Sequence, residues 1–310
     1  MTGTGYDIIG DIHGHGSALI ALLEYLGYRH SATGFQHATR QVIFLGDFID
    51  RGEDLKEHRL VLDTVMPMVR NGHALAVMGN HEFNALAFHT EVEGRPLRSH
   101  TDKNVNQHRA FLNEYQHDPV ARAEVLNFFY ELPLWLEVDG LRAIHACWHT
   151  KHVEIAGQWL EGARLTPQLL PMAATKGTVL FDSIEVLLKG FEVKLPDGID
   201  FPDKDGHLRN AVRIRWWERS ARTLGEVVQP PTTNIAHAAL LPIPEEVPLY
   251  AVDAPPCFIG HYWLKGKPAV CASNVACLDY SVAKAGQLVA YRWSGEQVLV
   301  NEHFTYVKKQ

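Results

Sequence analysis

The chain has no long apolar run. None of its 310 residues falls in a stretch of about 18 apolar residues, the length that a membrane-spanning helix needs. Its start, MTGTGYDIIGD, has neither the basic stretch nor the apolar run of a secretory signal peptide. We therefore expect a cytoplasmic protein with no membrane partner.

Cysteine is scarce, with four residues in the whole chain and no C-x-x-C pair. A chain of this length with so few cysteines is typical of a reduced intracellular protein rather than a disulfide-stapled secreted one. No basic residue is clearly paired with Cys147 to activate it, so we expect it to pack in the core and not to act as a nucleophile.

An excess of positive charge is also missing. The chain has 29 Lys and Arg against 36 Asp and Glu, which gives a net charge of −7. Such a balance does not attract nucleic acid over the whole surface, so we expect no nucleic-acid partner. Any recognition of phosphate must depend on a local group of residues.

Apolar strands followed by polar loops and helical patterns occur three times, with the three strands and loops in the first 82 residues. The loops are GDIHGHG after Tyr6 to Ile9, GDFIDRG after Val42 to Leu45, and GNHE after the strand at residues 74–78. Repeated strand–loop–helix units predict an α/β (α+β) fold, in which ligands bind at the carboxyl ends of the strands.

The remaining chain suggests one domain over residues 1–310 with two cap insertions, at about 90–131 and 156–250. The first insertion is polar and helical in pattern. Asp139-Gly140 predicts a hairpin turn between two strands. A second turn at Ser294-Gly295 is expected to join the last two strands.

Six side chains at predicted strand ends are suitable metal ligands: Asp11, His13, Asp47, Asn80, His145 and His261. Carboxylate and imidazole together favour first-row divalent ions, Mn first, with Fe, Zn, Co and Ni as alternatives. Asp47 lies on the central unit and is the natural bridge between two ions. We assign Asp11, His13 and Asp47 to one ion, and Asp47, Asn80, His145 and His261 to the other.

Three further residues in these loops have predicted catalytic roles. His81 directly follows Asn80 and can protonate the leaving group as general acid. Asp50 can fix the His81 ring, and Arg51 can clamp the non-bridging oxygens of a phosphate.

The motifs GDIHG, GDFIDRG and GNHE resemble the signature of calcineurin-like metallophosphoesterases of the phosphoprotein phosphatase superfamily, in particular its bacterial branch. The resemblance implies a β-sandwich of two mixed sheets flanked by helices, with His145 and His261 completing a binuclear metal centre. It also implies hydrolysis of phosphomonoesters, phosphoproteins among them, by in-line attack of a metal-bridging hydroxide. The substrate would be a phosphorylated small molecule, a nucleotide or a phosphoprotein.

Two alternatives stay open at this point. One is a hydrolase of dinucleoside polyphosphates such as diadenosine tetraphosphate, with Trp216 or Trp217 stacking on a base. The other is a non-catalytic protein that binds a phosphate ligand on the same fold. Arg215 is the favoured second phosphate-binding arginine, and His149 is a further candidate for substrate contact.

Overall fold

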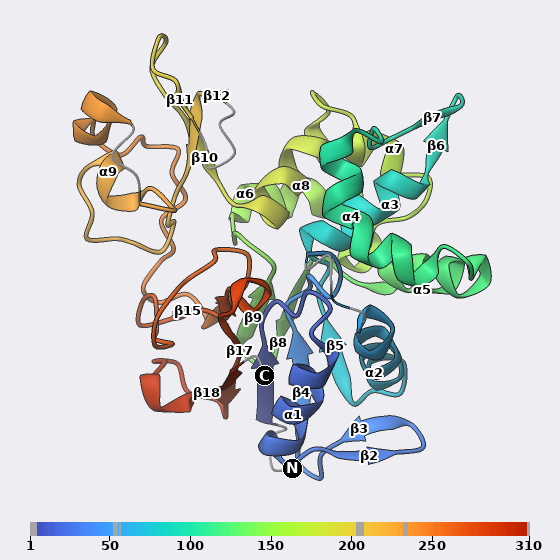
Figure 1. Cartoon of the computed structure of the whole chain (residues 1–310). Coiled ribbons are helices and arrows are strands. Elements are labelled where there is room, and N and C mark those ends of the chain that lie inside the picture. The colour runs from blue at the N-terminus through green and yellow to red at the C-terminus, as the bar shows by residue number, and fades with distance from the viewer. Residues whose placement is uncertain (1–4, 52–54, 56, 203–207, 232–234, 309–310) are drawn as a thin grey trace.

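Two β-sheets packed face to face form the centre of the molecule (Figure 1). The computed structural model describes residues 5–51, 55, 57–202, 208–231 and 235–308. The larger sheet has the order β16-β17-β1-β4-β5 with β18 paired to β17, and the smaller has the order β15-β14-β9-β8. The strands of the larger sheet are β1 Gly5–Ile9, β4 Arg40–Phe44, β5 Ala74–Ala76, β16 Asp279–Tyr280, β17 Gln287–Trp293 and β18 Phe304–Lys308. Those of the smaller sheet are β8 Trp135–Val138, β9 Leu141–Ile144, β14 Cys257–Ile259 and β15 Val275–Cys277.

Alternating side chains of the strands supply both faces of the larger sheet. Ile8 and Ile43 pack in one apolar cluster with Phe258 of the smaller sheet. Ile9 and Phe44 point the other way and pack in the cluster that includes the helices. This period of two places one face in the sandwich and the other under helices, and it confirms the predicted α/β fold with two mixed sheets.

The three expected strand–loop–helix units are present. Helix α1 (Gly16–Leu26) follows β1, α2 (His58–Arg70) follows β4, and α3 (Asn80–His89) follows β5. The amphipathic pattern after GDFIDRG predicts a second helix over about residues 54–69, and residue 54 lies outside the described residues. Because β1, β4 and β5 run parallel, their carboxyl ends meet at one edge of the sheet. Strands β9 and β14 are also parallel to each other in the second sheet.

The two predicted hairpins have different outcomes. Strands β8 and β9 pair antiparallel across Asp139 and Gly140, whose φ angles of 49° and 86° are those of a tight hairpin turn. The prediction at Ser294-Gly295 is wrong, because β17 pairs with β18 at residues 304–308. Within residues 298–300 only Leu299 is buried, while Val298 is 64% exposed. This run therefore belongs to a loop that Leu299 attaches to the core, and it does not pair with β17.

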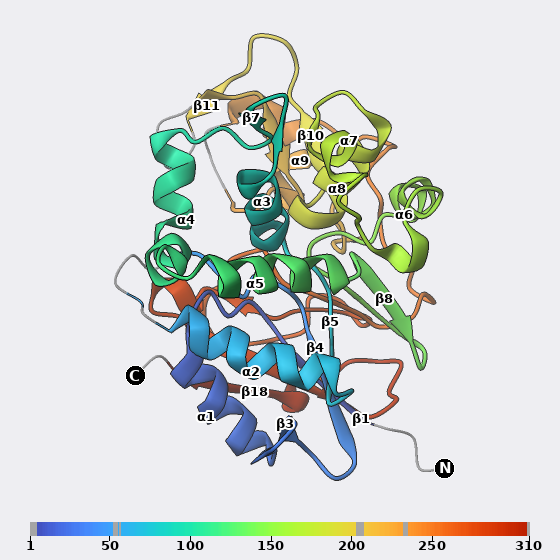
Figure 2. The same ribbon diagram turned by 90° about the vertical axis from the view of Figure 1, so that its right-hand side faces the viewer.

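The regions expected as insertions form two groups of elements beyond the strand ends (Figures 1 and 2). The first region is helical, as predicted, and the second has a small apolar cluster of its own that includes Val193, Val212 and Leu224. The first contains β6 Glu91–Val92, β7 Arg95–Pro96, α4 Asp102–Tyr115 and α5 Pro119–Glu131. The second contains η1 Glu161–Ala163, α7 Leu170–Ala174, α8 Val179–Lys189, β10 Glu192–Lys194, β11 Phe201–Pro202, β12 Leu208–Arg209, β13 Ala211–Arg213, α9 Leu224–Val227 and η2 Ala236–Leu240.

The remaining elements are short. They are β2 Arg29–Ser31, β3 Gly34–Gln36, α6 Thr150–Gly157, η3 Val282–Lys284 and η4 Asn301–His303. Among the described residues, no helix combines the length and the apolar character required to cross a membrane.

Candidate active site

Five strand ends bring the predicted metal-ligand residues into one buried cluster. Asp11 and His13 follow β1, Asp47 follows β4, and Asn80 opens α3 after β5. His145 directly follows β9, and His261 comes two residues after β14. All six residues are at most 8% exposed. The sheet edges thus unite residues that are up to 250 positions apart in the chain.

The Asp47 carboxylate lies at the centre of the cluster. Its Oδ2 is 3.6 Å from His13 Nε2, and its Oδ1 is 3.4 Å from His145 Nε2. Asn80 Oδ1 lies 3.2 Å from the same His145 nitrogen. Asp11 lies 4.0 Å from His13 Nε2 and accepts a hydrogen bond from the His261 backbone N–H. Asp47 therefore borders both predicted groups, as a bridging ligand would.

Backbone carbonyls fix the orientation of two of the imidazole rings. His13 Nδ1 bonds the Ile49 carbonyl at 2.9 Å, and His145 Nδ1 bonds the Leu45 carbonyl at 2.7 Å. Each ring then presents Nε2 to the cluster, which is the usual arrangement for a metal-ligating histidine.

The cluster fits the two divalent ions that its residue types suggest. Ligand atoms of His13, Asp47 and His81 lie within 4.8 Å of one another, and so do those of Asp47, His145 and His261. His13 Nε2 and His261 Nε2 are buried and have no hydrogen-bond partner, which is costly unless something else binds them. The first group contains His81 where we expected Asp11, and the individual ligand roles stay predictions.

Glycines allow the backbone to approach the carboxylates of the cluster. A Cβ on Gly260 would overlap Asp11 Oδ1, and a Cβ on Gly79 would overlap Asp47 Oδ1. The glycine before Asn80 and the glycine before His261 are therefore required by space around the predicted ligands, which explains their place in GNHE and in FIGHYW.

Glu82, the last residue of GNHE, was not predicted to have a role. Its buried carboxylate accepts hydrogen bonds from the backbone N–H groups of Asp47, Phe48 and Gly79 at 2.8 to 2.9 Å. Burial, and then the nearby Asp47 carboxylate, raises the pKa of Glu82 to about 8. Glu82 thus joins the GDFIDRG loop after β4 to the start of α3.

Burial lowers the pKa of His13 to about 3 and holds the pKa of His261 well below its usual range. Both rings are therefore neutral near pH 7, which is the form that binds metals. Burial also disfavours the charged form of His145, but the Asp47 carboxylate outweighs this effect and raises the pKa of His145 to about 10.

Asp50 is shared by two histidines. His81 Nδ1 lies 2.7 Å from one carboxylate oxygen, as predicted, and His108 Nδ1 lies 2.6 Å from the other. Although burial alone would raise the pKa of Asp50, His108 and then His81 hold it well below its usual value. His108 Nε2 in turn lies 3.2 Å from His89 Nε2. Sequence reasoning missed His108, because the helical pattern of α4 does not indicate where its faces point.

Arg51 follows the same loop and lines a large cleft above the cluster. Its guanidinium lies 4.9 Å from the centre of the Trp263 ring, and its buried Nε has no hydrogen-bond partner. A cation in this position is available to an anionic ligand.

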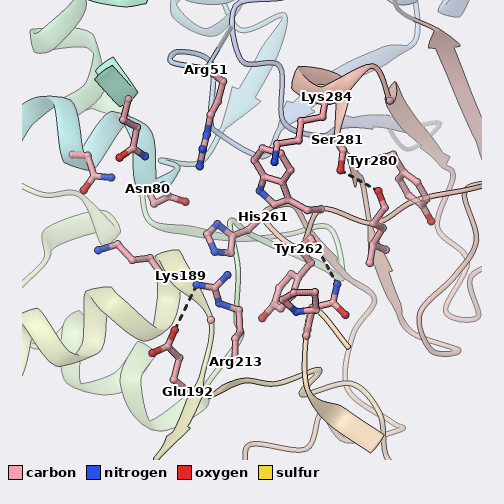
Figure 3. Close-up of a pocket in the computed structure, with 18 of the residues that line it drawn as sticks. Arg51, Asn80, Lys189, Glu192, Arg213, His261, Tyr262, Tyr280, Ser281 and Lys284 are labelled. Carbon is pink, nitrogen blue, oxygen red and sulfur yellow. Dashed lines mark hydrogen bonds and ion pairs between the residues drawn. The ribbon is translucent and has the colours of Figure 1, made fainter. Parts of the chain in front are cut away.

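The cleft encloses about 1760 Å³ and is strongly basic. Its floor includes Asn80 and His261. Figure 3 shows the Arg213 guanidinium next to the His261 ring. Among the described lining residues, nine are basic and three are acidic, which makes this region positive within a negative protein. The basic residues are Arg51, Arg98, Lys103, Lys189, Arg209, Arg213, Lys265, Lys284 and Lys308; the acidic ones are Asp182, Glu185 and Glu192.

The two substrate-contact candidates outside the motifs do not line the cleft. The Arg215 guanidinium donates to the Glu226 carbonyl, and along the alternating β13 segment it is Arg213 that faces the cleft. His149 packs against His152 and Phe191, and His152 is the one that borders the cleft. The predicted residue and the residue that lines the cleft are only two positions apart for Arg215 and Arg213, and three for His149 and His152. Only the direction of the side chain separates them.

The two tryptophans proposed as base-stacking residues belong to the core. Trp216 is fully buried and donates from Nε1 to the Ala146 carbonyl, and Trp217 is 4% exposed. Stacking on a substrate is excluded for both. Cys147 is a buried free cysteine, as expected, and burial raises its pKa well above the usual range.

A family comparison agrees with this geometry. The sequence model of calcineurin-like phosphoesterases matches residues 6–172, which is more than half of the chain. The chain belongs to the calcineurin-like phosphoesterase family. The matched segment contains all three loop motifs and His145. His261 lies beyond it, yet the fold brings this residue to the same cluster.

Curated relatives of this phosphoesterase include bacterial enzymes named bis(5'-nucleosyl)-tetraphosphatase PrpE (asymmetrical). The one from Oceanobacillus iheyensis is 30% identical over 144 residues, which cover 45% of this chain and 54% of the relative. The one from Anoxybacillus flavithermus is 40% identical over 77 residues, which cover 24% of this chain and 30% of the relative. The chain thus spans about half or less of the curated relatives it matches.

Solved structures support the fold over the whole phosphoesterase chain. A protein serine/threonine phosphatase from Saccharomyces cerevisiae superposes with a TM-score of 0.53 at 11% identity and covers 99% of this chain and 80% of its own. A candidate diadenosine tetraphosphatase superposes with a TM-score of 0.50 at 16% identity and covers 100% of this chain and 95% of its own. At these identities the likeness concerns the fold alone.

Proposed function

We propose that this phosphoesterase is a metal-dependent hydrolase of phosphoric esters or anhydrides. The observation that carries the proposal is the pair of buried ligand groups that share Asp47, in which two ring nitrogens have no protein partner. A non-catalytic phosphate-binding protein on the same fold would not require this complete set of donors.

We keep the assignment made from the sequence, in which Asp11, His13 and Asp47 would hold one ion. Asn80, His145 and His261 would hold the other ion, again together with Asp47. Two divalent ions held there, with Mn as our first choice, would supply positive charge for a phosphate and acidify a water molecule.

His81 and Arg51 have the remaining roles. Because Asp50 binds His81 Nδ1, the proton to be transferred is held at Nε2, where His81 can give it to the departing oxygen. Arg51 binds the non-bridging oxygens of the phosphate with its guanidinium, and its position against Trp263 limits the directions it can take.

Two substrate classes fit this site. A phosphomonoester needs only the metal cluster, Arg51 and His81. A dinucleoside polyphosphate would also use the length and the nine cations of the cleft. The names of the bacterial relatives indicate this substrate for those proteins. We favour the polyphosphate, because a single phosphate leaves most of the basic side chains of the cleft unused.

The test compares diadenosine tetraphosphate with a phosphopeptide, using p-nitrophenyl phosphate as a common reference. With Mn²⁺ added, we expect turnover of all three substrates to depend on Asp47. We also expect kcat/KM to be higher for the tetraphosphate than for the phosphopeptide. Asp47→Asn should lower kcat about a thousandfold or more, because the bridging charge is lost. Near-normal turnover by Asp47→Asn would refute the metal mechanism, and preference for the phosphopeptide would refute the substrate assignment.

A further inference from the structure

A chain of polar contacts leads from His81 to an arginine of the first insertion. Gln107 of α4 lines the cleft, and its Nε2 lies 3.5 Å from His81 Nε2. The Gln107 Oε1 accepts a hydrogen bond of 3.0 Å from the Arg98 guanidinium. Arg98 also donates to Asn84 Oδ1 at 2.9 Å. The insertion therefore reaches the proposed general acid directly.

Arg98 is a half-buried cation with neutral partners. The two hydrogen bonds described for its side chain go to amide oxygens, and no carboxylate of the described residues lies within ion-pair distance. Burial lowers the pKa of Arg98, with only weaker opposing effects from Asp50 and Glu185. Removing a guanidinium from water without a counter-ion is unfavourable, so a bound anion would stabilise this arrangement.

Arg98 lies on the side of the cleft from which the leaving group is expected to depart. His81 gives its proton to the leaving group, so the leaving group departs on the side of the cleft where His81 meets Gln107. Arg98 lies directly behind Gln107 on this side, while Arg51 approaches the cluster from the loop after β4. Lys103 and Asn104 of the same helix also line the cleft.

We propose that Arg98 and Gln107 form a subsite for a leaving group that itself carries phosphate, such as a nucleoside phosphate. This inference rests on the proposed function, and it makes a phosphoanhydride the bond that is cleaved. The oxygen of water forms a bond to phosphorus and gives up a proton, and the bond from phosphorus to the bridging oxygen breaks. The electron pair stays on the bridging oxygen, which takes the proton of His81, and Arg98 offsets the negative charge that the departing phosphate carries.

The experiment measures kcat/KM for diadenosine tetraphosphate and for p-nitrophenyl phosphate in the full-length protein with Mn²⁺. For Arg98→Gln we expect the ratio of the two values to shift by about tenfold or more against the tetraphosphate, because one charged contact to the leaving group is lost. Arg98→Lys keeps the charge and should recover part of that loss. The matched control is Arg95→Gln, an exposed arginine of β7 outside the cleft, which should leave the ratio unchanged.

A second variant keeps the inference testable should Arg98→Gln fold poorly. Gln107→Glu has nearly the same shape and places a negative charge in the subsite, so it should also shift the ratio against the tetraphosphate. An unchanged ratio in both variants would overturn the subsite. Absence of hydrolysis of either substrate by the wild-type protein would instead overturn the proposed function.

Discussion

At the scale of single residues, Asp50 fixes the orientation of the proposed general acid His81. It holds the ring of His81 with one oxygen and receives His108 with the other. With both oxygens bonded, the carboxylate has one orientation, and so does the His81 ring. Catalysis by His81 should therefore depend on a residue that never touches the substrate.

His108→Phe and His108→Asn test this dependence as a pair. The phenyl ring can keep the packing of His108 against Phe111 but removes the bond to Asp50, so we expect kcat to fall about tenfold with KM little changed. Asn can still donate an N–H to Asp50 and should retain most of the wild-type kcat. Equal losses in both variants would mean that His108 serves only the packing of α4.

At the scale of elements, a side chain of helix α4 caps the N-terminus of helix α2, although the two helices are more than 30 residues apart in the sequence. The first two backbone N–H groups of α2, at His58 and Arg59, donate to the Glu114 carboxylate at 2.9 and 3.0 Å. The residue before the helix, Glu57, forms no side-chain cap. The Glu114 side chain is 11% exposed, so this contact joins the first insertion firmly to the sandwich.

Glu114→Ala should lower the free energy of unfolding by about 1–2 kcal/mol at pH 7, because two N–H groups lose their acceptor. Burial alone would raise the pKa of Glu114. Hydrogen bonds from the His58 side chain and from the backbone outweigh burial, so the pKa of Glu114 is below its usual value. A carboxylate with a lowered folded-state pKa stabilises the protein above its unfolded pKa, near 4.3, and this stability is lost as the pH falls through the folded value.

Denaturant unfolding at several pH values measures this effect. The difference between wild type and Glu114→Ala should be full at pH 6 to 7 and should shrink below about pH 4. The exposed Glu91→Ala is the control and should change little at any pH. A Glu114→Ala protein as stable as the wild type at pH 7 would show that the contact across the chain is dispensable.

Sequence patterns predicted the elements around β1, β4 and β5 well, because apolar runs, glycine-rich loops and helices alternate there on a short scale. Hence Asp11, His13, Asp47, Asn80 and His81 could be placed at one sheet edge. His145 and His261 were expected there from their places after predicted strands and from the family resemblance, and the parallel β9 and β14 bring them to the cluster.

Side-chain direction in the insertions could not be predicted in the same way. Arg213 rather than Arg215 faces the cleft, and Trp216 bonds the backbone of Ala146 in the core. These outcomes depend on which face of a short strand packs on the sandwich. Local sequence does not contain that information, and the contacts of Arg98 and His108 were missed for the same reason.

At the scale of the whole molecule, the protein separates its charges. The chain as a whole carries −7, while nine basic residues among those described line the cleft beside the predicted metal ligands. Both insertions contribute to that wall, Arg98 and Lys103 from the first and Lys189, Arg209 and Arg213 from the second. We propose that residues 1–310 act as one domain in which the insertions hold the substrate and the sandwich holds the metals.

The most direct test of this account is the number of metal ions per chain, measured by elemental analysis on purified, active protein. We expect about two divalent ions per chain, loss of activity and a lower thermal midpoint after treatment with a chelator, and recovery of both with Mn²⁺. Asp47→Asn should bind fewer ions than the wild type. An active preparation without bound metal, whose turnover and thermal midpoint are unaffected by the chelator, would contradict the account.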